Sequence, residues 1–336
     1  MAQAARYCGD HRFDIVDTAI PEPKADEVRL RVAHCGVCGT DMHIFHGKMD
    51  ARVAPPQIIG HEMSAVVDAL GSEVTGWSLG DGATVRPLRS CGSCAACDAG
   101  HSHVCQNLSF IGIDEAGAFQ EYWCVPAALC HRLPTGMDLA HGALIEPVAV
   151  ACHDVRRARI APGETAAVLG AGPIGLLVAM VARDSGATVR LFEIDAGRRA
   201  MAKELGFETC DPSSADPLEN VQAWTNGAGC NVVFECTAAA PCAELMTKLV
   251  GVRGRVCVVG IFPNAVPVDL FQVFWKEVEI IGARVYEAED FERAIALAAS
   301  GSLPLDRLIT GRRPLAEIQQ AFEQAQSGIK TLVDIS

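Results

Sequence analysis

The sequence predicts an α/β protein of two domains, one irregular and rich in β-strands, the other built around a doubly wound parallel sheet. Three observations lead to this prediction. At 336 residues, half of them hydrophobic, the chain exceeds what a single core comfortably supports. Short strand-like runs separated by Gly, Pro and Asp fill its first half. In its second half, strands alternate with helices, which is typical of a parallel sheet.

The β-rich domain is predicted from four runs with the pattern of strands. Residues 27–34 (EVRLRVAH) alternate apolar and polar side chains, as a half-buried strand does. The three other runs are residues 63–69, 83–86 and 119–125. Two amphipathic segments near the end of the chain, residues 290–299 and 315–326, predict helices that return to this domain. We therefore expect the domain to comprise residues 1–152 and 290–336.

The remaining residues, 153–289, predict the parallel-sheet domain. Apolar strand patterns and helical patterns follow one another here, which implies right-handed βαβ connections. The predicted strands are residues 168–169, 188–192, 232–235 and 255–259, and the predicted helices are residues 174–185 and 198–205.

Charge and composition exclude several classes of protein. The formal charge of −13 disfavours nucleic acid and anionic membrane surfaces as partners. Residues 1–18 carry charges where a signal peptide would need an apolar core, and no apolar run is long enough to span a bilayer. The fifteen cysteines are an odd number without a secretion signal, which argues against a disulfide framework. We expect a cytoplasmic protein whose partner is a small molecule.

Four cysteines form the most informative motif. Cys91, Cys94, Cys97 and Cys105 have the spacing C-x2-C-x2-C-x7-C, and four thiolates so placed suit a closed, structural zinc site. Four unrelated free thiols are the first alternative. A zinc ribbon that binds nucleic acid or protein is the second, but such ribbons pair two CxxC knuckles across a longer gap, and the acidic charge counts against them.

A glycine turn predicts a dinucleotide site. The sequence GAGPIG follows a strand and opens a helix, so that the helix N-terminus can receive a pyrophosphate. Its candidate cofactor-binding residues are Gly170, Gly172, Pro173, Ile174 and Gly175.

The next strand predicts which dinucleotide is bound. Glu193 ends that strand, at the position where a carboxylate bonds the ribose hydroxyls and repels a 2′-phosphate. Ile194, the following residue, is not basic. NAD is therefore favoured over NADP. NADP stays an alternative, because the guanidinium of Arg198 could bind its 2′-phosphate.

A second candidate metal site combines three segments: CGVCGTDMH with Cys38, GHE with His61 and Glu62, and IEPVAVACH with Glu146. Taken singly, each of these residues has an ordinary explanation as a buried thiol or a hydrogen-bonded side chain. Their occurrence together, in a first half that also holds every histidine of the chain, favours metal binding.

The order of these motifs resembles that of the zinc-containing medium-chain alcohol dehydrogenase family, in its polyol, butanediol and threonine dehydrogenase branch, and is similar to sorbitol dehydrogenase. The resemblance covers essentially the whole chain. It implies a GroES-like catalytic domain, a Rossmann domain for the cofactor, and two zinc ions per chain, one catalytic and one structural. It also implies that Cys38 and His61 bind the catalytic zinc together with a carboxylate. Either Glu62 or Glu146 is that carboxylate, and the choice stays open.

The resemblance also implies a reaction. Zinc favours the alkoxide form of a bound secondary alcohol, and the alkoxide transfers hydride to NAD to give a ketone. Thr40 resembles the hydroxyl of the family's proton relay, and His43 is expected to pass the proton to solvent. A turn-stabilising hydroxyl and a surface histidine are the competing interpretations of these two residues. Homodimers or homotetramers fit the resemblance, and residues 256–261 with the following loop are the expected interface.

The substrate prediction rests on one departure from the pattern. Val285-Tyr286 stands where sorbitol dehydrogenases carry Arg-Tyr. If a strand continued there, the side chain of Arg284 would point to the opposite face from that of Val285. The missing guanidinium favours a small diol or secondary alcohol over a long polyol, within the general expectation of a polyol or vicinal diol. An enzyme similar to threonine 3-dehydrogenase is the first competing hypothesis, but no residue stands out to receive the substrate's carboxylate. A zinc-independent enone or quinone reductase is the second, and it would lack both cysteine motifs. A zinc-stabilised, cofactor-binding protein without catalytic activity is the third.

Overall fold

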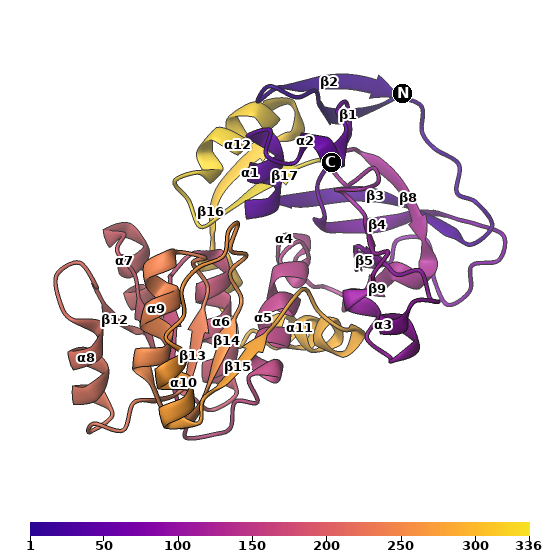
Figure 1. Ribbon diagram of the computed structural model, residues 1–336. Helices are drawn as coiled ribbons and strands as arrows, with labels where there is room; N and C mark the ends of the chain where they lie inside the picture. Colours follow the sequence, from indigo (N-terminus) through magenta and orange to yellow (C-terminus); the bar gives the residue numbers. More distant parts are fainter. The chain divides into compact units, whose positions relative to one another are not determined.

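The computed structural model describes all 336 residues and divides the chain into two compact units (Figure 1). Unit 1 comprises Met1–Glu146 and Glu287–Ser336, and unit 2 comprises Pro147–Tyr286. The first boundary falls within the first turn of helix α5 (Ile145–Arg157), a few residues before the boundary expected from the change in composition. None of the helices combines the length and the apolar composition that a membrane crossing requires.

Unit 2 is built on six parallel strands in the order β12-β11-β10-β13-β14-β15. The chain starts in the middle of the sheet, proceeds to one edge, returns, and proceeds to the other, which is the predicted doubly wound arrangement. The strands are β10 (Thr165–Leu169), β11 (Thr188–Phe192), β12 (Glu208–Cys210), β13 (Cys230–Glu235), β14 (Val250–Val258) and β15 (Glu279–Gly282).

Helices connect these strands and pack against the sheet, α6 on β10 and β11, and α9 on β13 and β14 (Figure 1). They are α6 (Pro173–Asp184), α7 (Ala196–Glu204), α8 (Pro217–Trp224), α9 (Ala240–Leu249) and α10 (Leu270–Lys276). Side chains such as Val168, Leu191 and Phe234 are fully buried, because a parallel sheet is covered on both faces.

One expectation about unit 2 is wrong. β14 lies between β13 and β15, so Val256 and Cys257 are buried within the sheet and are not available to a second chain. Ile261 and the loop that follows it, with Pro263, Asn264 and Ala265, are exposed, so the expectation is wrong only for the strand itself. The two free edges of the sheet are β12 and β15.

Unit 1 is organised by a seven-stranded sheet in the order β16-β17-β3-β4-β5-β9, with β8 also paired to β3. Its strands are β3 (Glu27–Val37), β4 (Glu62–Leu70), β5 (Gly82–Val85), β8 (Tyr122–Pro126), β9 (Cys130–Arg132), β16 (Ile309–Pro314) and β17 (Lys330–Asp334). The strand predicted for residues 119–125 begins only at Tyr122, because the amides of Ala118 and Phe119 bond to the carbonyls of Gly60 and Ile59.

Short elements complete unit 1. Two small sheets pair β1 (Ala2–Tyr7) with β2 (Phe13–Thr18), and β6 (Leu88–Arg89) with β7 (Ser109–Phe110). The α-helices are α1 (Gly39–Phe45), α2 (Asp50–Val53), α3 (Ala95–Asp98), α4 (Leu139–Gly142), α11 (Ala288–Ser300) and α12 (Ile318–Ala325). The 3-10 turns are η1 (Ser102–Val104), η2 (Ala127–Leu129), η3 (Leu305–Arg307) and η4 (Leu315–Glu317). The two helices predicted near the end of the chain are α11 and α12, the second shortened because η4 precedes it.

The register of the large sheet brings three distant segments together. β3 and β4 are antiparallel with Gly36 opposite Glu62, so Cys38, which follows β3, and His61, which precedes β4, lie at the same end of the sheet. β17 pairs with the other side of β3, with Thr331 opposite Val37, and this places Lys330 at that end as well.

Candidate active site

Cys38 is fixed at the start of α1 by a reciprocal cap. Its Sγ accepts a hydrogen bond from the Thr40 amide at 3.2 Å, and its own amide donates to Asp41 Oδ2 at 3.0 Å. A sulfur takes here the place that a Ser or Thr hydroxyl has in the usual capping box. Burial and the Asp41 carboxylate raise the pKa of the Cys38 thiol, so that its ionisation depends on a nearby cation.

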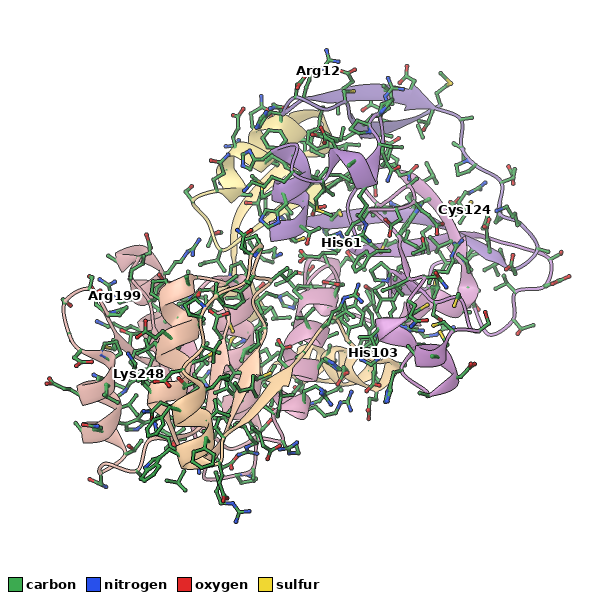
Figure 2. The ribbon with its side chains drawn as sticks, viewed as in Figure 1. Arg12, His61, His103, Cys124, Arg199 and Lys248 are labelled. Atoms are coloured by element: carbon green, nitrogen blue, oxygen red, sulfur yellow. The ribbon has the colours of Figure 1, made fainter.

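His61 meets Cys38 directly. Its Nε2 lies 3.2 Å from Cys38 Sγ, and its ring lies at the start of β4 within unit 1 (Figure 2). A tetrahedral zinc would hold such a sulfur and nitrogen about 3.6 Å apart, so the pair can bind the ion after a small adjustment. Burial alone would lower the pKa of His61, but Cys38 and Asp41, with a smaller contribution from Glu146, hold it well above its usual range.

Asp41 belongs to this site, although the sequence analysis did not single it out. The side chain is fully buried, and its Oδ1 lies 3.7 Å from His61 Nδ1. Neither of these two atoms has a hydrogen-bond partner. A carboxylate behind a metal-binding histidine orients the ring and selects its tautomer. Asp41, Cys38 and His61 form a group whose ligand atoms lie within 4.8 Å of one another, and their chemistry fits zinc.

Glu62 is engaged by a lysine that the sequence analysis also missed. Glu62 Oε2 lies 2.5 Å from Lys330 Nζ, which also donates to the Val37 carbonyl at 3.3 Å. Both side chains are buried. Burial alone would lower the pKa of Lys330, but the charges of Glu62 and Cys38 hold it above its usual value. The available signal for this pair was a lysine at the start of β17, a strand whose residues 330–333 are all buried.

Neither candidate carboxylate ligand is in the group formed by Cys38, Asp41 and His61. Glu62 is held by Lys330. Glu146 is buried in the first turn of α5, close enough for its charge to raise the pKa values of His61 and Lys330. The position of Glu62 favours Glu146 as the carboxylate that completes the metal site.

The two proposed relay residues lie on α1. Thr40 is half-buried next to Cys38, and His43 is exposed one turn further along the helix. Burial and the charges of Lys48 and His46 lower the pKa of His43, so its ring is neutral near physiological pH and can accept a proton. No hydrogen bond joins the Thr40 hydroxyl to His43, and the relay stays a prediction.

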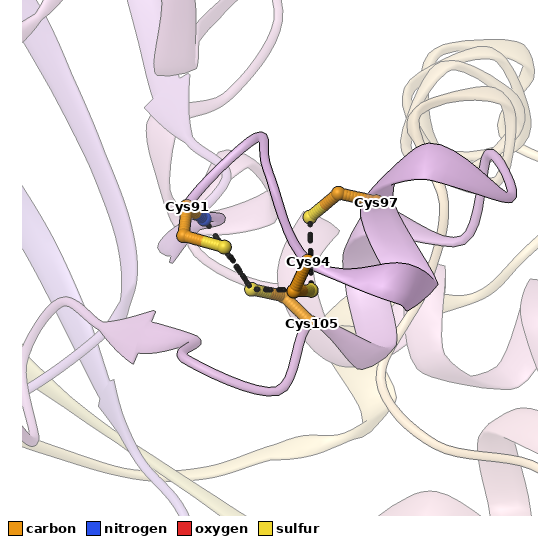
Figure 3. A group of neighbouring side chains, drawn as sticks. All are labelled: Cys91, Cys94, Cys97 and Cys105. Atoms are coloured by element: carbon orange, nitrogen blue, oxygen red, sulfur yellow. Dashed lines mark hydrogen bonds between the residues drawn. The ribbon is translucent and has the colours of Figure 1, made fainter.

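The four thiols of the C-x2-C-x2-C-x7-C motif converge in a lobe between β6 and β7 (Figure 3). Sγ–Sγ distances are 3.6 Å for Cys94–Cys97, 3.7 Å for Cys94–Cys105 and 3.5 Å for Cys105–Cys91. Sulfurs bound to one tetrahedral zinc at about 2.3 Å would be separated by about 3.8 Å. The thiols therefore meet the geometric requirement for the predicted structural zinc.

Hydrogen bonds around the lobe favour the thiolate form of Cys91 and Cys94, whereas burial and the bonds with Cys91 and Cys97 raise the pKa of Cys105 to about 11. The amide of Gln106 donates to Cys94 Sγ at 3.4 Å, and the amide of Asn107 donates to Cys105 Sγ at 3.3 Å. A backbone bond from Ser93, with bonds from Cys105 and Asn107, lowers the pKa of Cys91 to about 6. The sulfurs thus have the donors that a bound metal's ligands require.

The glycine turn of unit 2 has the geometry of a dinucleotide site. Gly170 has a φ of +95°, and a side chain at Gly175 would lie 2.2 Å from the Gly170 carbonyl, so neither position tolerates another residue. Gly172 is the N-cap of α6 and Pro173 its first residue, which leaves the amides of the first turn free for a phosphate.

Glu193 lies against this turn. Its Oε2 accepts a hydrogen bond from the Ala171 amide at 2.7 Å, and its Oε1 accepts one from the Asp195 amide at 2.9 Å. Arg199, labelled in Figure 2, was missed by sequence reasoning. It donates to the carbonyls of Glu193 and Ile194 and pairs with Asp211 at 2.8 Å. These contacts hold the end of β11 in place.

Arg198 lies beside the glycines. A Cβ built on Gly172 would be 3.8 Å from its Nη1, and its guanidinium has no acidic partner. Arg198, which kept NADP as an alternative cofactor in the sequence analysis, is thus close to the expected site of the pyrophosphate.

The strand expected around Val285 is not formed. β15 ends at Gly282, and Val285 has a φ of +50°. The direction expected for Arg284 assumed a strand, and that assumption is wrong.

Two family models match the chain. The alcohol dehydrogenase GroES-like domain matches residues 24–135, and the zinc-binding dehydrogenase model matches residues 173–300.

Individual proteins are similar over nearly the whole chain. A 2-dehydro-3-deoxy-L-galactonate 5-dehydrogenase of Pseudoalteromonas atlantica is 50% identical over 98% of each chain. A sorbitol dehydrogenase of Halalkalibacterium halodurans is 32% identical over 97% of this chain and 96% of its own. A solved structure from Sinorhizobium meliloti, described as a zinc-binding dehydrogenase and bound to NADP, is 35% identical, with a TM-score of 0.93 and coverage of 100% of this chain and 99% of its own.

Replacement of Cys97 by Ser should remove one zinc per chain and lower stability by more than about 4 kcal/mol, as loss of a structural metal does. Zinc analysis and urea unfolding would measure both effects. Cys124→Ser, a half-buried cysteine outside the lobe, is the matched control. Unchanged zinc content in Cys97→Ser would contradict the role of the lobe.

Replacement of Lys330 by Met should destabilise the protein by about 3–5 kcal/mol, because it leaves the buried Glu62 carboxylate unpaired. Lys330→Met combined with Glu62→Gln should recover most of this loss, since the second change removes the unpaired charge. Urea unfolding of the single and double variants makes the comparison. If the double variant lost as much stability as the two single variants together, the ion pair with Glu62 would not be the contribution of Lys330 to stability.

Proposed function

Because this chain belongs to the zinc-binding dehydrogenase family with a GroES-like alcohol dehydrogenase domain, we propose that it is a zinc- and NAD-dependent enzyme that oxidises a secondary alcohol to a ketone. That it is an alcohol or polyol oxidoreductase follows from the family and from relatives such as the sorbitol dehydrogenase. The metal ligands, the cofactor and the substrate are the proposed part.

One observation carries the proposal: the buried charge around Cys38 and His61. Asp41 is fully buried, and neither its Oδ1 nor His61 Nδ1 has a hydrogen-bond partner, whereas the buried Glu62 is paired with Lys330. Buried charges need partners of opposite sign. A zinc ion bound by Cys38 and His61 would supply positive charge next to the Asp41 carboxylate.

Each residue of the site then has a separate role in the proposed reaction. When bound, zinc lowers the pKa of an alcohol hydroxyl and so promotes loss of its proton. Asp41 lies 3.7 Å from the imidazole of His61, and Glu146 would complete the ligand set. Thr40 and His43 would take the hydroxyl proton to solvent, and a nicotinamide cofactor would supply the hydride acceptor. Two electrons and one proton thus reach the cofactor as hydride, and the second proton leaves through His43.

The cofactor is proposed to be NAD. The carboxylate of Glu193 stands at the end of β11, and Ile194 beside it is exposed and apolar. A 2′-phosphate would meet the negative charge of Glu193. The NADP bound to the protein from Sinorhizobium meliloti and the position of Arg198 make NADP the second cofactor to be measured.

The substrate is proposed to be an open-chain sugar acid with a secondary hydroxyl. The support is the relative from Pseudoalteromonas atlantica, whose name gives 2-dehydro-3-deoxy-L-galactonate as its substrate and whose identity of 50% extends over 98% of both chains. A neutral polyol or vicinal diol is the second candidate, supported by the sorbitol dehydrogenase.

We also propose a homo-oligomer that forms through unit 2. β15 is one of the two edge strands of the parallel sheet, and Ile280 on it is exposed. On α10, Phe271 and Trp275 stack at 5.7 Å, and both are more than half exposed, as is Phe274. An apolar patch of this kind beside an unpaired strand favours contact with a second copy. The cytoplasmic location expected from the sequence stays a prediction.

The proposed function is tested by NADH formation with a panel of alcohols. The panel holds 2-dehydro-3-deoxy-L-galactonate, sorbitol, xylitol, the isomers of butane-2,3-diol and L-threonine, each with NAD and NADP. We expect activity that a chelator abolishes and zinc restores. Activity that persists in zinc-free protein, or no activity with any secondary alcohol in protein that holds two zinc ions, would contradict the proposal.

Cys38→Ala should reduce kcat/KM by at least about 1,000-fold, because the thiolate ligand is lost, and should leave the protein folded. Cys35→Ala is the matched control, since Cys35 is a buried cysteine three residues away without a proposed ligand role. Circular dichroism and NADH titration would report folding and cofactor binding in both variants. Normal turnover by Cys38→Ala would refute the ligand assignment.

A further inference from the structure

Unit 1 contains a cavity of about 400 Å³ that shares no lining residue with the site at Cys38 and His61. This volume lies within the range of small-molecule sites. The lining combines apolar side chains, Leu88 and Leu129 among them, with basic and hydroxyl side chains. The basic and hydroxyl residues are Arg86, Arg89, Ser90, Ser102 and His103.

Hydrogen bonds hold the walls of this cavity together. The Arg86 amide donates to the Leu129 carbonyl at 2.8 Å, which joins the end of β5 to η2. The amide of Cys91, next to Ser90, donates to Cys105 Sγ at 3.3 Å, which ties the two ends of the four-cysteine lobe together. The polar residues that follow β5 and β6 thus belong to a preorganised wall, and preorganisation lowers the cost of binding a ligand.

The guanidinium of Arg86 has no partner in the protein. The side chain is half-buried, its Nε is buried without a hydrogen bond, and its terminal nitrogens enter no hydrogen bond or ion pair. A guanidinium keeps its positive charge in proteins, and a charge that is partly withdrawn from water favours an opposite charge beside it. An anion in the cavity would supply that charge.

Three further residues offer donors to the same anion. Glu115 lies 3.1 Å from Nη1 of Arg89, and the Arg89 side chain is 45% exposed. A guanidinium has five N–H donors, so one such contact leaves others for a ligand. The hydroxyls of Ser90 and Ser102 make no hydrogen bond within the protein.

The acidic groups around the cavity do not cancel this charge. Glu115 is paired with Arg89, and Glu287 Oε1 lies 3.4 Å from Nδ1 of His103, which is labelled in Figure 2. Asp26 also lines the cavity, but it is exposed, so water weakens the field of its carboxylate. Two guanidiniums therefore oppose a single carboxylate in the lining.

We propose that this cavity binds a phosphate group, either as inorganic phosphate or as part of a small phosphorylated compound, with Arg86 as its main ligand. A tetrahedral phosphate can accept hydrogen bonds from a guanidinium and from both hydroxyls at once, whereas a carboxylate has two oxygens in one plane. A phosphate that bonds to Ser90 and Ser102 would connect the residue before Cys91 with the turn before Cys105 and so stabilise the zinc lobe. The site lies outside the proposed reaction, and the inference does not rest on that reaction.

Calorimetric titration of the zinc-loaded protein with inorganic phosphate and with glycerol 3-phosphate tests the inference. Arg86→Met should weaken binding by about 10- to 100-fold, the loss expected for a hydrogen bond between charged groups, and Arg86→Lys should recover part of it. Arg6→Met is the matched control, because Arg6 Nε is also buried without a partner but Arg6 does not line the cavity. Cys38→Ala should bind phosphate normally, which separates this site from the proposed active site.

The same titrations identify the source of the phosphate group. Tighter binding of glycerol 3-phosphate would indicate an organic phosphate, and equal affinities would indicate the free ion. Succinate, a dianion without a phosphate group, should bind at least about 10-fold more weakly, because it cannot reach all the donors at once.

Four results would overturn the inference: no saturable binding of either phosphate, equal binding of succinate, unchanged affinity in folded Arg86→Met, or loss of binding in Cys38→Ala. Circular dichroism would show whether the variants are folded. Should Arg86→Met fail to fold, Ser102→Ala decides the question, because Ser102 is exposed and its loss leaves the core intact. We expect about 2- to 10-fold weaker phosphate binding by Ser102→Ala, and unchanged affinity would refute the site.

Discussion

The structure depends on the balance of charge at one end of the unit 1 sheet. Asp41 and Glu62 are buried there beside the Cys38 thiol, with Lys330 paired to Glu62 and the imidazole of His61 lying 3.7 Å from Asp41. Water cannot compensate this charge, so the protein needs a proton or a metal ion at the site. The elements around it follow from that need: α1 begins at Cys38, β4 begins after His61, and the final strand of the chain brings Lys330 to Glu62.

The two candidate metal sites differ in a way that chemistry explains. In the lobe, four thiols at nearly equal separations would surround an ion completely and leave no room for a substrate. Beside β3, one thiol, one imidazole and a carboxylate leave a position open. The first arrangement stabilises a loop, whereas the second permits chemistry on a bound hydroxyl.

The sequence was informative where structure is set by local patterns. The doubly wound sheet followed from alternating apolar runs, and the glycine turn from its place between a strand and a helix. The four-cysteine lobe followed from spacing alone, since its ligands lie within fifteen residues.

Features that depend on pairing between distant segments could not be predicted in the same way. The contact of Lys330 with Glu62 requires the register of β17 on β3, and that of Arg89 with Glu115 requires the pairing of β6 with β7. The strand order that buries β14 is likewise a property of the whole sheet. Asp41 could have been predicted from the sequence, because a carboxylate three residues after a capping Cys is a recognisable local pattern.

The most direct test of this account is the location of zinc in crystals of the purified protein, by anomalous scattering at the zinc edge. The account predicts two peaks per chain, one among the four thiols of the lobe and one between Cys38 and His61. A single peak in the lobe, with no metal at Cys38 in zinc-replete protein, would contradict it.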